Sequence, residues 1–149
     1  MAVMTYTEGI AEALEKLLTQ AGRSIDVAVY RFNNPKLVGA IAGARQRGIR
    51  IRLVLDRNKY EESASTRALF AAAKIPLRVR YGRRGPGSKM HHKFAIIDGD
   101  VLVTGSYNWT LESEEQNYED LLILRNPEQL AMYQQEFEML WAASAPAQE

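Results

Sequence analysis

An order of strand, helix and strand in the first third of the chain constrains the fold more than any other feature. Residues 25–30 alternate in polarity, with Ile25, Val27 and Val29 on one face. Asn34-Pro35 then opens a helix that Gly48 ends, and a second alternating run covers residues 49–55. This order within one compact unit implies a right-handed crossover and a parallel strand pair. The sequence therefore predicts an α/β fold with a mixed, largely parallel central sheet flanked by helices.

The other expected elements surround this unit and leave no room for a second domain. In chain order they are a helix over residues 10–21, a helix over 61–74, a strand over 77–81, two strands joined by a turn at Gly99, a strand over 118–124 and a helix that begins after Asn126. A chain of 149 residues fits a single domain. We expect that domain to span residues 1–143 and a flexible tail to span residues 144–149.

The composition excludes several classes of site. The chain has no cysteine, so disulfides and zinc-thiolate sites are excluded and the redox compartment is not indicated. No run of about eighteen apolar residues is present, and residues 1–6 lack the charged-then-apolar pattern of a signal peptide. We expect a soluble chain without a membrane partner. The sequence leaves the compartment open between the cytoplasm and, if a signal peptide has been removed, the periplasm.

A histidine and a lysine two positions apart carry the first indication of chemistry. On a strand, His91 and Lys93 point to the same face, which places a nucleophile or proton shuttle beside a fixed positive charge. A flexible Gly105 and then the hydroxyl of Ser106 and the amide of Asn108 follow the next strand. These groups suit the binding of a phosphate and attack on a phosphate ester.

The same residues match the signature of a known superfamily, H-x-K-x4-D-x6-G-[S/T]-x-N. Every position of that signature is filled, by His91, Lys93, Asp98, Gly105, Ser106 and Asn108. The chain thus resembles the phospholipase D superfamily, and from about Tyr6 to Trp141 its layout is similar to the small bacterial nucleases of that superfamily. The resemblance implies a phosphodiesterase fold with the signature residues at the active site.

The number of histidines suggests how the site is assembled. His91 and His92 are the only two, and on a strand these neighbours point to opposite faces, so both cannot serve one phosphate. We expect two copies of His91 to meet across a two-fold axis, one forming a phosphohistidine while the other protonates the leaving group and later activates water. The resemblance implies the same homodimer. A histidine pair that shares one proton predicts a bell-shaped pH profile.

The remaining signature residues are assigned to binding or to structure. We expect Lys93 and Asn108 to hold the phosphate oxygens, with a hydroxyl or backbone contact from Ser106. Asp98 lies seven residues beyond His91, on the opposite strand face and roughly 23 Å away along a continuous strand. It is therefore expected to be structural, holding the turn around Gly99 or bonding at the dimer interface.

Other charged residues near the signature require a choice between a functional and a structural role. Glu119 corresponds to a glutamate that holds the catalytic histidine in small nucleases of this family, although Asp120 and Glu115 are alternatives close by in the sequence. We expect His92 to pack on the far side of its strand. The acidic residues Glu112, Glu114 and Glu115 are expected on a solvated surface, and neither a metal nor a cofactor is expected.

Basic residues just before the signature bear on the substrate. They lie on and beside a glycine-rich segment that could follow a polyanion, and they are Arg78, Arg80, Arg83, Arg84 and Lys89. No motif for reading base edges is evident. The sequence favours a metal-independent, sequence-nonspecific endonuclease; the resemblance implies DNA as the substrate ahead of RNA, which stays open. Two alternatives stay open: a phospholipid-hydrolysing enzyme of phospholipase D type, and a catalytically silent module that binds nucleic acid.

Overall fold

The structure, a computed structural model, describes residues 3–147. Within this range one sheet of eight strands has the order β1-β7-β6-β5-β2-β3-β4-β8. The strands are β1 (Met4–Tyr6), β2 (Ser24–Val29), β3 (Arg50–Asp56), β4 (Arg78–Arg80), β5 (Lys93–Ile97), β6 (Val101–Gly105), β7 (Leu121–Leu124) and β8 (Ala145–Pro146). The α/β class with a mixed sheet is confirmed.

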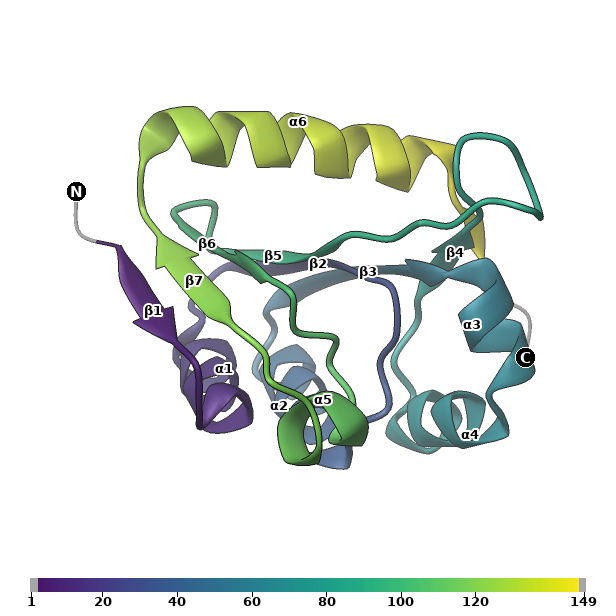
Figure 1. The fold of residues 1–149 in the computed structure, drawn as a ribbon, viewed down its shortest axis with the longest axis horizontal. Helices are drawn as coiled ribbons and strands as arrows, with labels where there is room; N and C mark the ends of the chain where they lie inside the picture. The colour runs from purple at the N-terminus through teal and green to yellow at the C-terminus, as the bar shows by residue number, and fades with distance from the viewer. Residues whose placement is uncertain (1–2, 148–149) are drawn as a thin grey trace.

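Helices cover both faces of this sheet. They are α1 (Ile10–Gln20), α2 (Pro35–Gln46), α3 (Arg57–Glu62), α4 (Ala64–Ala73), α5 (Leu111–Glu115) and α6 (Pro127–Ala143). The long helix α6 lies alone on one face, whereas α1, α2, α4 and α5 lie on the other (Figure 1). None of the helices in residues 3–147 is both long enough and apolar enough to cross a bilayer.

The proportion of parallel pairing differs from the expectation. Only β2 with β3 and β3 with β4 are parallel. The other five neighbouring pairs are antiparallel. The helical crossover near the N-terminus does produce parallel strands, but β5 and β6 form a hairpin around Gly99 and β7 returns beside them. The sheet is therefore largely antiparallel. The β5–β6 pair is a short hairpin, whereas β2 with β5, β1 with β7 and β4 with β8 pair strands that are far apart in the sequence.

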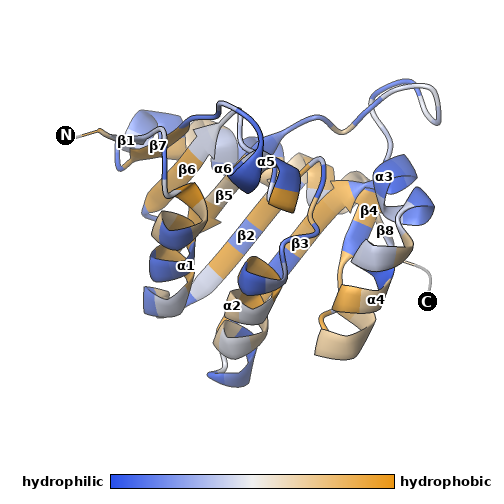
Figure 2. Ribbon diagram, turned by 60° about the horizontal axis from the view of Figure 1, so that its bottom comes forward, coloured by the Kyte–Doolittle hydropathy of each residue, from blue (hydrophilic) through white to orange (hydrophobic). Residues whose placement is uncertain are grey.

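The alternation of β2 distributes its side chains between two cores. Ile25, Val27 and Val29 are fully buried in the core shared with α1 and α2, whereas Ala28 belongs to the core beneath α6. Figure 2 shows the apolar residues concentrated along the central strands and polar residues on the outer sides of the helices. The expected two-faced strand is confirmed, because a side-chain period of two sends alternate residues to opposite faces.

Two expected segments differ in their boundaries. The helix expected over residues 61–74 is broken, because Ser63 ends α3 and its hydroxyl caps α4 by accepting from the backbone N–H of Thr66. The flexible tail expected from residue 144 begins with structured residues. Ser144 is buried, and Ala145–Pro146 form β8 against β4, while residues 148 and 149 lie outside the described range.

A buried ion pair attaches α6 to the sheet. Asp26 on β2 is 2 % exposed and accepts two hydrogen bonds from the guanidinium of Arg52 on β3, each 2.9 Å long. The same guanidinium donates to Glu138 of α6 and lies over the ring of Phe137, 5.0 Å from its centroid. Removing Arg52 would leave a carboxylate away from water without its main partner, which is a large cost.

We therefore expect Arg52→Leu to lower the free energy of unfolding by about 3 kcal/mol. Chemical denaturation of the variant and the wild type measures the difference. Arg57→Leu is the control, because its pair with Glu61 is partly exposed and contributes less than about 1 kcal/mol. Equal losses for the two variants would show that the buried pair does not stabilise the junction between α6 and the sheet.

Candidate active site

The signature histidine lies where the parallel strands β2 and β3 end. The segment that carries it, residues 90–92, precedes β5 and is held at two points. The backbone N–H of Tyr30, just after β2, donates to the carbonyl of His92 at 2.9 Å. The buried carboxylate of Asp56, at the end of β3, accepts from the backbone N–H of Met90 at 2.9 Å. The carboxyl ends of parallel strands are the usual position of a ligand site in α/β sheets.

His91 and Lys93 point the same way, as the two-residue spacing predicts. The Lys93 ammonium lies 3.3 Å from Nδ1 of His91 and donates to the His91 carbonyl at 3.0 Å. Because an ammonium can only donate, the Nδ1 atom facing it is an acceptor. The contact favours the uncharged imidazole, which is the form that can act as a nucleophile.

The charges around the pair favour the same protonation state. Partial desolvation and then the positive charges of Lys93 and Lys89 lower the pKa of His91 below its ordinary value. Desolvation also lowers the pKa of Lys93, while the carboxylate of Glu119 acts in the opposite direction. A lowered imidazole pKa enlarges the neutral fraction of His91 near pH 7.

Asn108 and Ser106 differ in how far they are free to bind a phosphate. The Asn108 carbonyl oxygen accepts from the backbone N–H of Arg31, and its amide nitrogen has no partner within residues 3–147. The Ser106 hydroxyl instead donates to Glu119, and the Ser106 backbone N–H donates to Asp120. Asn108 thus presents an unused donor, whereas both donors of Ser106 are engaged within the chain.

Glu119 does not contact His91 of its own chain. Its carboxylate accepts from the Ser106 hydroxyl and from the side-chain amide of Asn117, and its charge acts on Lys93. The structure therefore brings Glu119 to the site through Ser106 and Lys93. An orienting role toward His91 stays a prediction. The neighbouring Asp120 holds the Ser106 backbone instead.

Asp98 has a structural role away from the site, although not the one expected. Its carboxylate accepts from the backbone N–H groups of Gly22, Arg23 and Ser24, which fixes the start of β2. Desolvation acts in the opposite direction, yet these backbone donors lower the pKa of Asp98. The Asp98 carboxylate thus anchors the α1–β2 connection rather than the Gly99 turn.

The signature glycine is explained by a close approach of two strands. Gly105 has φ 153°, and a Cβ atom there would lie 2.4 Å from the Asp120 carbonyl oxygen. No other residue fits this position without moving the chain that carries Glu119.

His92 packs on the far side of its strand as expected, and Glu115 is exposed, but Glu112 and Glu114 are half-buried and paired within the chain rather than solvated. His92 faces α6, where Nε2 lies 2.8 Å from Glu136 and the ring packs edge-on against Phe94. Glu112 pairs with Arg31, and Glu114 accepts from the Tyr107 hydroxyl. Throughout the described part of the chain, no group of three or more acidic, histidine or cysteine residues is arranged to hold a metal ion.

The basic residues before the signature divide into two sets. Arg78 is committed to the fold, because its guanidinium donates to Ser144 and lies 4.9 Å from the Trp141 ring centroid. Arg78 is therefore not available for a polyanion in this arrangement. The side chains of the other basic residues form no hydrogen bond or ion pair with residues 3–147, and they are Arg80, Arg83, Arg84 and Lys89.

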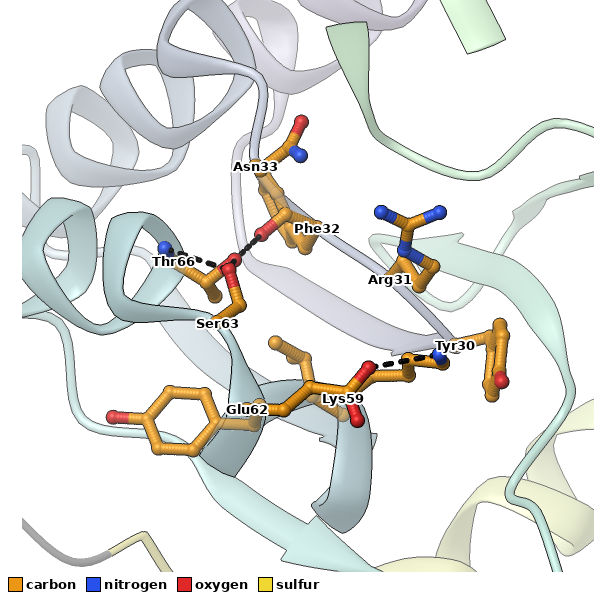
Figure 3. A pocket seen from close by; sticks show the side chains of 10 residues that line it. Tyr30, Arg31, Phe32, Asn33, Lys59, Glu62, Ser63 and Thr66 are labelled. Carbon is orange, nitrogen blue, oxygen red and sulfur yellow. Dashed lines mark hydrogen bonds and ion pairs between the residues drawn. The ribbon is translucent and has the colours of Figure 1, made fainter. Parts of the chain in front are cut away.

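Tyr30 is a site residue that the sequence analysis missed. Its ring is 8 % exposed, lies 4.6 Å from the His91 ring, centroid to centroid, and is 5.7 Å from the Lys93 ammonium. Figure 3 shows Tyr30 at the edge of a small pocket with Arg31 and Lys59, whose ammonium forms an ion pair with Glu62. Only its position after β2, where a strand ends at the site, could have indicated Tyr30 in advance.

Replacing the Tyr30 ring is expected to disturb the placement of His91 and Lys93. We expect Tyr30→Leu to lower kcat about fivefold with a smaller effect on KM, because a cation–π contact of this kind is worth about 1 kcal/mol. Tyr30→Phe keeps the ring and should keep most of kcat. Steady-state kinetics of the two variants provides the comparison, and equal losses in both would assign the effect to the hydroxyl group instead.

Comparison with known proteins is consistent with this site. Residues 14–141 match the family described as cardiolipin synthase, PLD-like domain. The chain is 35 % identical over 144 residues to a mitochondrial cardiolipin hydrolase of Xenopus tropicalis, covering 97 % of this chain and 67 % of that protein. For the protein of the same name from Danio rerio, identity is 35 % and the covered shares are 95 % and 63 %. The chain thus spans about two thirds of these relatives.

A solved structure extends the similarity to the whole described fold. The phospholipase D family member Nuc from Salmonella typhimurium superposes with a TM-score of 0.87 at 22 % identity, covering 99 % of both chains. The family match, the identity to the curated relatives and the filled signature agree. The chain belongs to the phospholipase D superfamily of phosphodiesterases.

Proposed function

We propose that the protein hydrolyses phosphodiesters without a metal, through a phosphohistidine on His91, at a site that two chains complete. The observation that carries this proposal is the different surroundings of the two histidines. His91 is exposed beside Lys93, whereas the ring of His92 is held against Glu136 and Phe94 on the other side of the strand. One chain therefore offers one imidazole, and the reaction needs two.

The reaction divides the work between the two chains. An imidazole nitrogen of His91 attacks phosphorus, and the phosphorus bond to the leaving oxygen breaks. His91 of the partner subunit gives its proton to that oxygen, then takes a proton from water as the water displaces the first imidazole. Lys93 and the free amide of Asn108 hold the nonbridging oxygens, whose charge increases in the transition state. Glu119 maintains the shape of the loop through Ser106.

For the substrate we propose nucleic acid, with DNA favoured over RNA and without sequence specificity. Support comes from the unpaired cations beside His91, since Arg80, Arg83 and Lys89 line one cleft with it. Neutralising successive phosphates is the main source of affinity for a polyanion. The helix that lines this cleft, α6, contributes Glu136, Met139 and Leu140 to it, none of which is a hydrogen-bond donor to base edges, and this agrees with nonspecific binding.

Phospholipid hydrolysis is the second candidate, and it is favoured by the names of the curated relatives. Both relatives described above are called mitochondrial cardiolipin hydrolase. Cardiolipin is itself a phosphodiester, so the same His91 chemistry would serve. The third alternative, a module that binds nucleic acid without cleaving it, predicts binding without turnover.

One assay separates these possibilities. Supercoiled plasmid, single-stranded DNA, RNA and cardiolipin vesicles are incubated with the protein in excess EDTA. We expect DNA to be cut faster than RNA and vesicles to be left intact. His91→Ala should abolish the cleavage. The matched control is His92→Gln, which changes the adjacent histidine and should retain most of the activity. Cleavage of vesicles alone would establish the lipid reaction, and DNA binding without cleavage would establish the silent module. Loss of DNA cutting in EDTA would refute metal independence.

A further inference from the structure

A cleft beside His91 extends away from the signature residues toward α6. It has a volume of about 360 Å³ and lies between the loop that follows β4 and the C-terminal half of α6. In Figure 1 this loop rises next to that end of α6. His91 is part of the lining, at the edge of the cleft where the strand segment of residues 90–92 separates the signature side from the α6 side, so a group attached to a phosphate at His91 lies next to the cleft.

The two walls of the cleft differ in chemistry. Arg80, Arg83 and Lys89 supply positive charge on the loop side. On the opposite side, Met139 and Leu140 of α6 supply an apolar surface, and the Glu136 carboxylate beside them is paired with His92. Met139 is 48 % exposed, so a large apolar side chain faces solvent at the cleft without a covering residue. A ligand that fits both walls carries negative charge and an apolar or aromatic group.

Both walls are fixed before any ligand binds. Gly82 allows the ends of the loop to meet, because a Cβ atom there would lie 2.4 Å from the backbone nitrogen of Lys89. Its backbone N–H donates to the Ser88 carbonyl at 3.1 Å, and the side-chain amide of Asn58 donates to Pro86 at 2.8 Å. On the other side, the contact between His92 and Glu136 holds α6 against the strand of His91. A preformed cleft loses little entropy when it binds.

We propose that this cleft binds the nucleoside attached to the scissile phosphate, with its base against Met139 and Leu140 and the adjoining phosphate beside Arg83 and Lys89. The proposal rests on the proposed action on nucleic acid and names a subsite for it. The volume is at the lower end of small-molecule pockets, about 300–1,000 Å³, which suits one nucleoside. A base offers a flat aromatic face to the Met139 thioether, a favourable contact for sulfur.

The cleft is less suited to a lipid. An acyl chain would need an apolar channel that continues beyond Leu140, and the loop wall of this cleft is cationic. A lipid headgroup could use the cations but would leave Met139 uncovered. The charge on one wall and the apolar surface on the other together favour the nucleoside.

The test uses small diesters with and without a nucleoside. The probes are the p-nitrophenyl esters of thymidine 3′-phosphate and thymidine 5′-phosphate, compared with bis(p-nitrophenyl) phosphate. We expect the wild type to hydrolyse one of the two thymidine esters with a kcat/KM roughly tenfold higher than that for bis(p-nitrophenyl) phosphate. Contacts in one apolar pocket provide differences of this size. Met139→Glu should reduce this preference to about twofold or less, because it places a negative charge against the base.

Met132→Glu is the matched control. Met132 lies seven residues earlier on the same helix, is 72 % exposed and does not line the cleft. Met132→Glu makes the same chemical change as Met139→Glu outside the cleft, and this variant should keep the thymidine preference. Because Met139 is also largely exposed, both variants should fold, and thermal unfolding of each verifies this. An equal preference in the wild type and Met139→Glu would overturn the proposal.

A lipid arm distinguishes this failure from failure of the proposed function. Dihexanoyl phosphatidylglycerol is added as a competitor of bis(p-nitrophenyl) phosphate. If the lipid competes, and Met139→Glu weakens this competition whereas Met132→Glu does not, the cleft binds lipid and the nucleoside assignment is wrong. If the small diesters are hydrolysed with a thymidine preference but plasmid and oligonucleotides are not cut, the subsite stands and the action on nucleic acid polymers fails.

Discussion

His91→Ala should lower kcat for DNA cleavage by at least about 10⁴-fold. In a dimer of identical chains this one substitution removes both the attacking imidazole and the imidazole that protonates the leaving oxygen. Because the two groups act as a unit, their losses overlap, and the residual rate reflects binding and Lys93 alone. Single-turnover cleavage of a labelled oligonucleotide in excess protein measures this step without the influence of product release.

The fold and the DNA affinity of this variant serve as its controls. His91 is exposed, so its removal should leave thermal unfolding within a few degrees of the wild type. The affinity for DNA should stay within about threefold, because the cations that bind phosphates are unchanged. A folded variant that retained more than about 1 % of the wild-type rate would contradict the role of His91 as the nucleophile.

Lys93→Met should lower kcat by about 10²–10³-fold, since it removes a charge aimed at the nonbridging oxygens of the transition state. Methionine keeps an unbranched apolar stem against the Tyr30 ring, so the loss is mainly one of charge. Kinetics with the same oligonucleotide gives the size of the effect. A drop in affinity with kcat unchanged would make Lys93 a ground-state binding residue instead.

The same substitution should raise the pKa of His91. Desolvation and then Lys93 lower that pKa in the wild type, so removing the ammonium lets the imidazole hold its proton to a higher pH. NMR titration of the histidine ring protons measures the shift directly, because the chain has only two histidines and His92→Gln assigns the signals. As the pH falls, His91 would then become protonated, and lose its nucleophilic form, at a higher pH than in the wild type. The acid limb of the activity profile therefore moves to higher pH. An unchanged His91 pKa would contradict the proposed coupling.

The sequence predicted those features that depend on local periodicity or on an ordered signature. Ile25, Val27 and Val29 share a face because the strand period is two, and Asn34-Pro35 begins α2 with the Asn34 side chain as the cap. The spacing of His91 and Lys93 also predicted their shared side and the separate environment of His92. Each of these inferences needs only the local chain.

Other features depend on tertiary placement, which no local pattern contains. One crossover predicted a largely parallel sheet, but β5 joins β2 antiparallel, and β6, β7 and the two edge strands β1 and β8 also pair antiparallel with their neighbours. The sequence predicts a hydroxyl or backbone contact from Ser106 to a phosphate, whereas the segment just before β7 brings the Glu119 carboxylate to that hydroxyl and Asp120 to that backbone N–H. Tyr30 reaches His91 only because β2 and β5 are adjacent.

Mixing active and inactive chains tests most directly whether two chains share one site. Wild-type and His91→Ala chains are combined in equal amounts, allowed to exchange subunits, and assayed for DNA cleavage. If each site needs His91 from both chains, only wild-type pairs are active, and the specific activity per total chain is about one quarter of the wild-type value. A value of about one half would show that each chain works alone and would contradict the shared site.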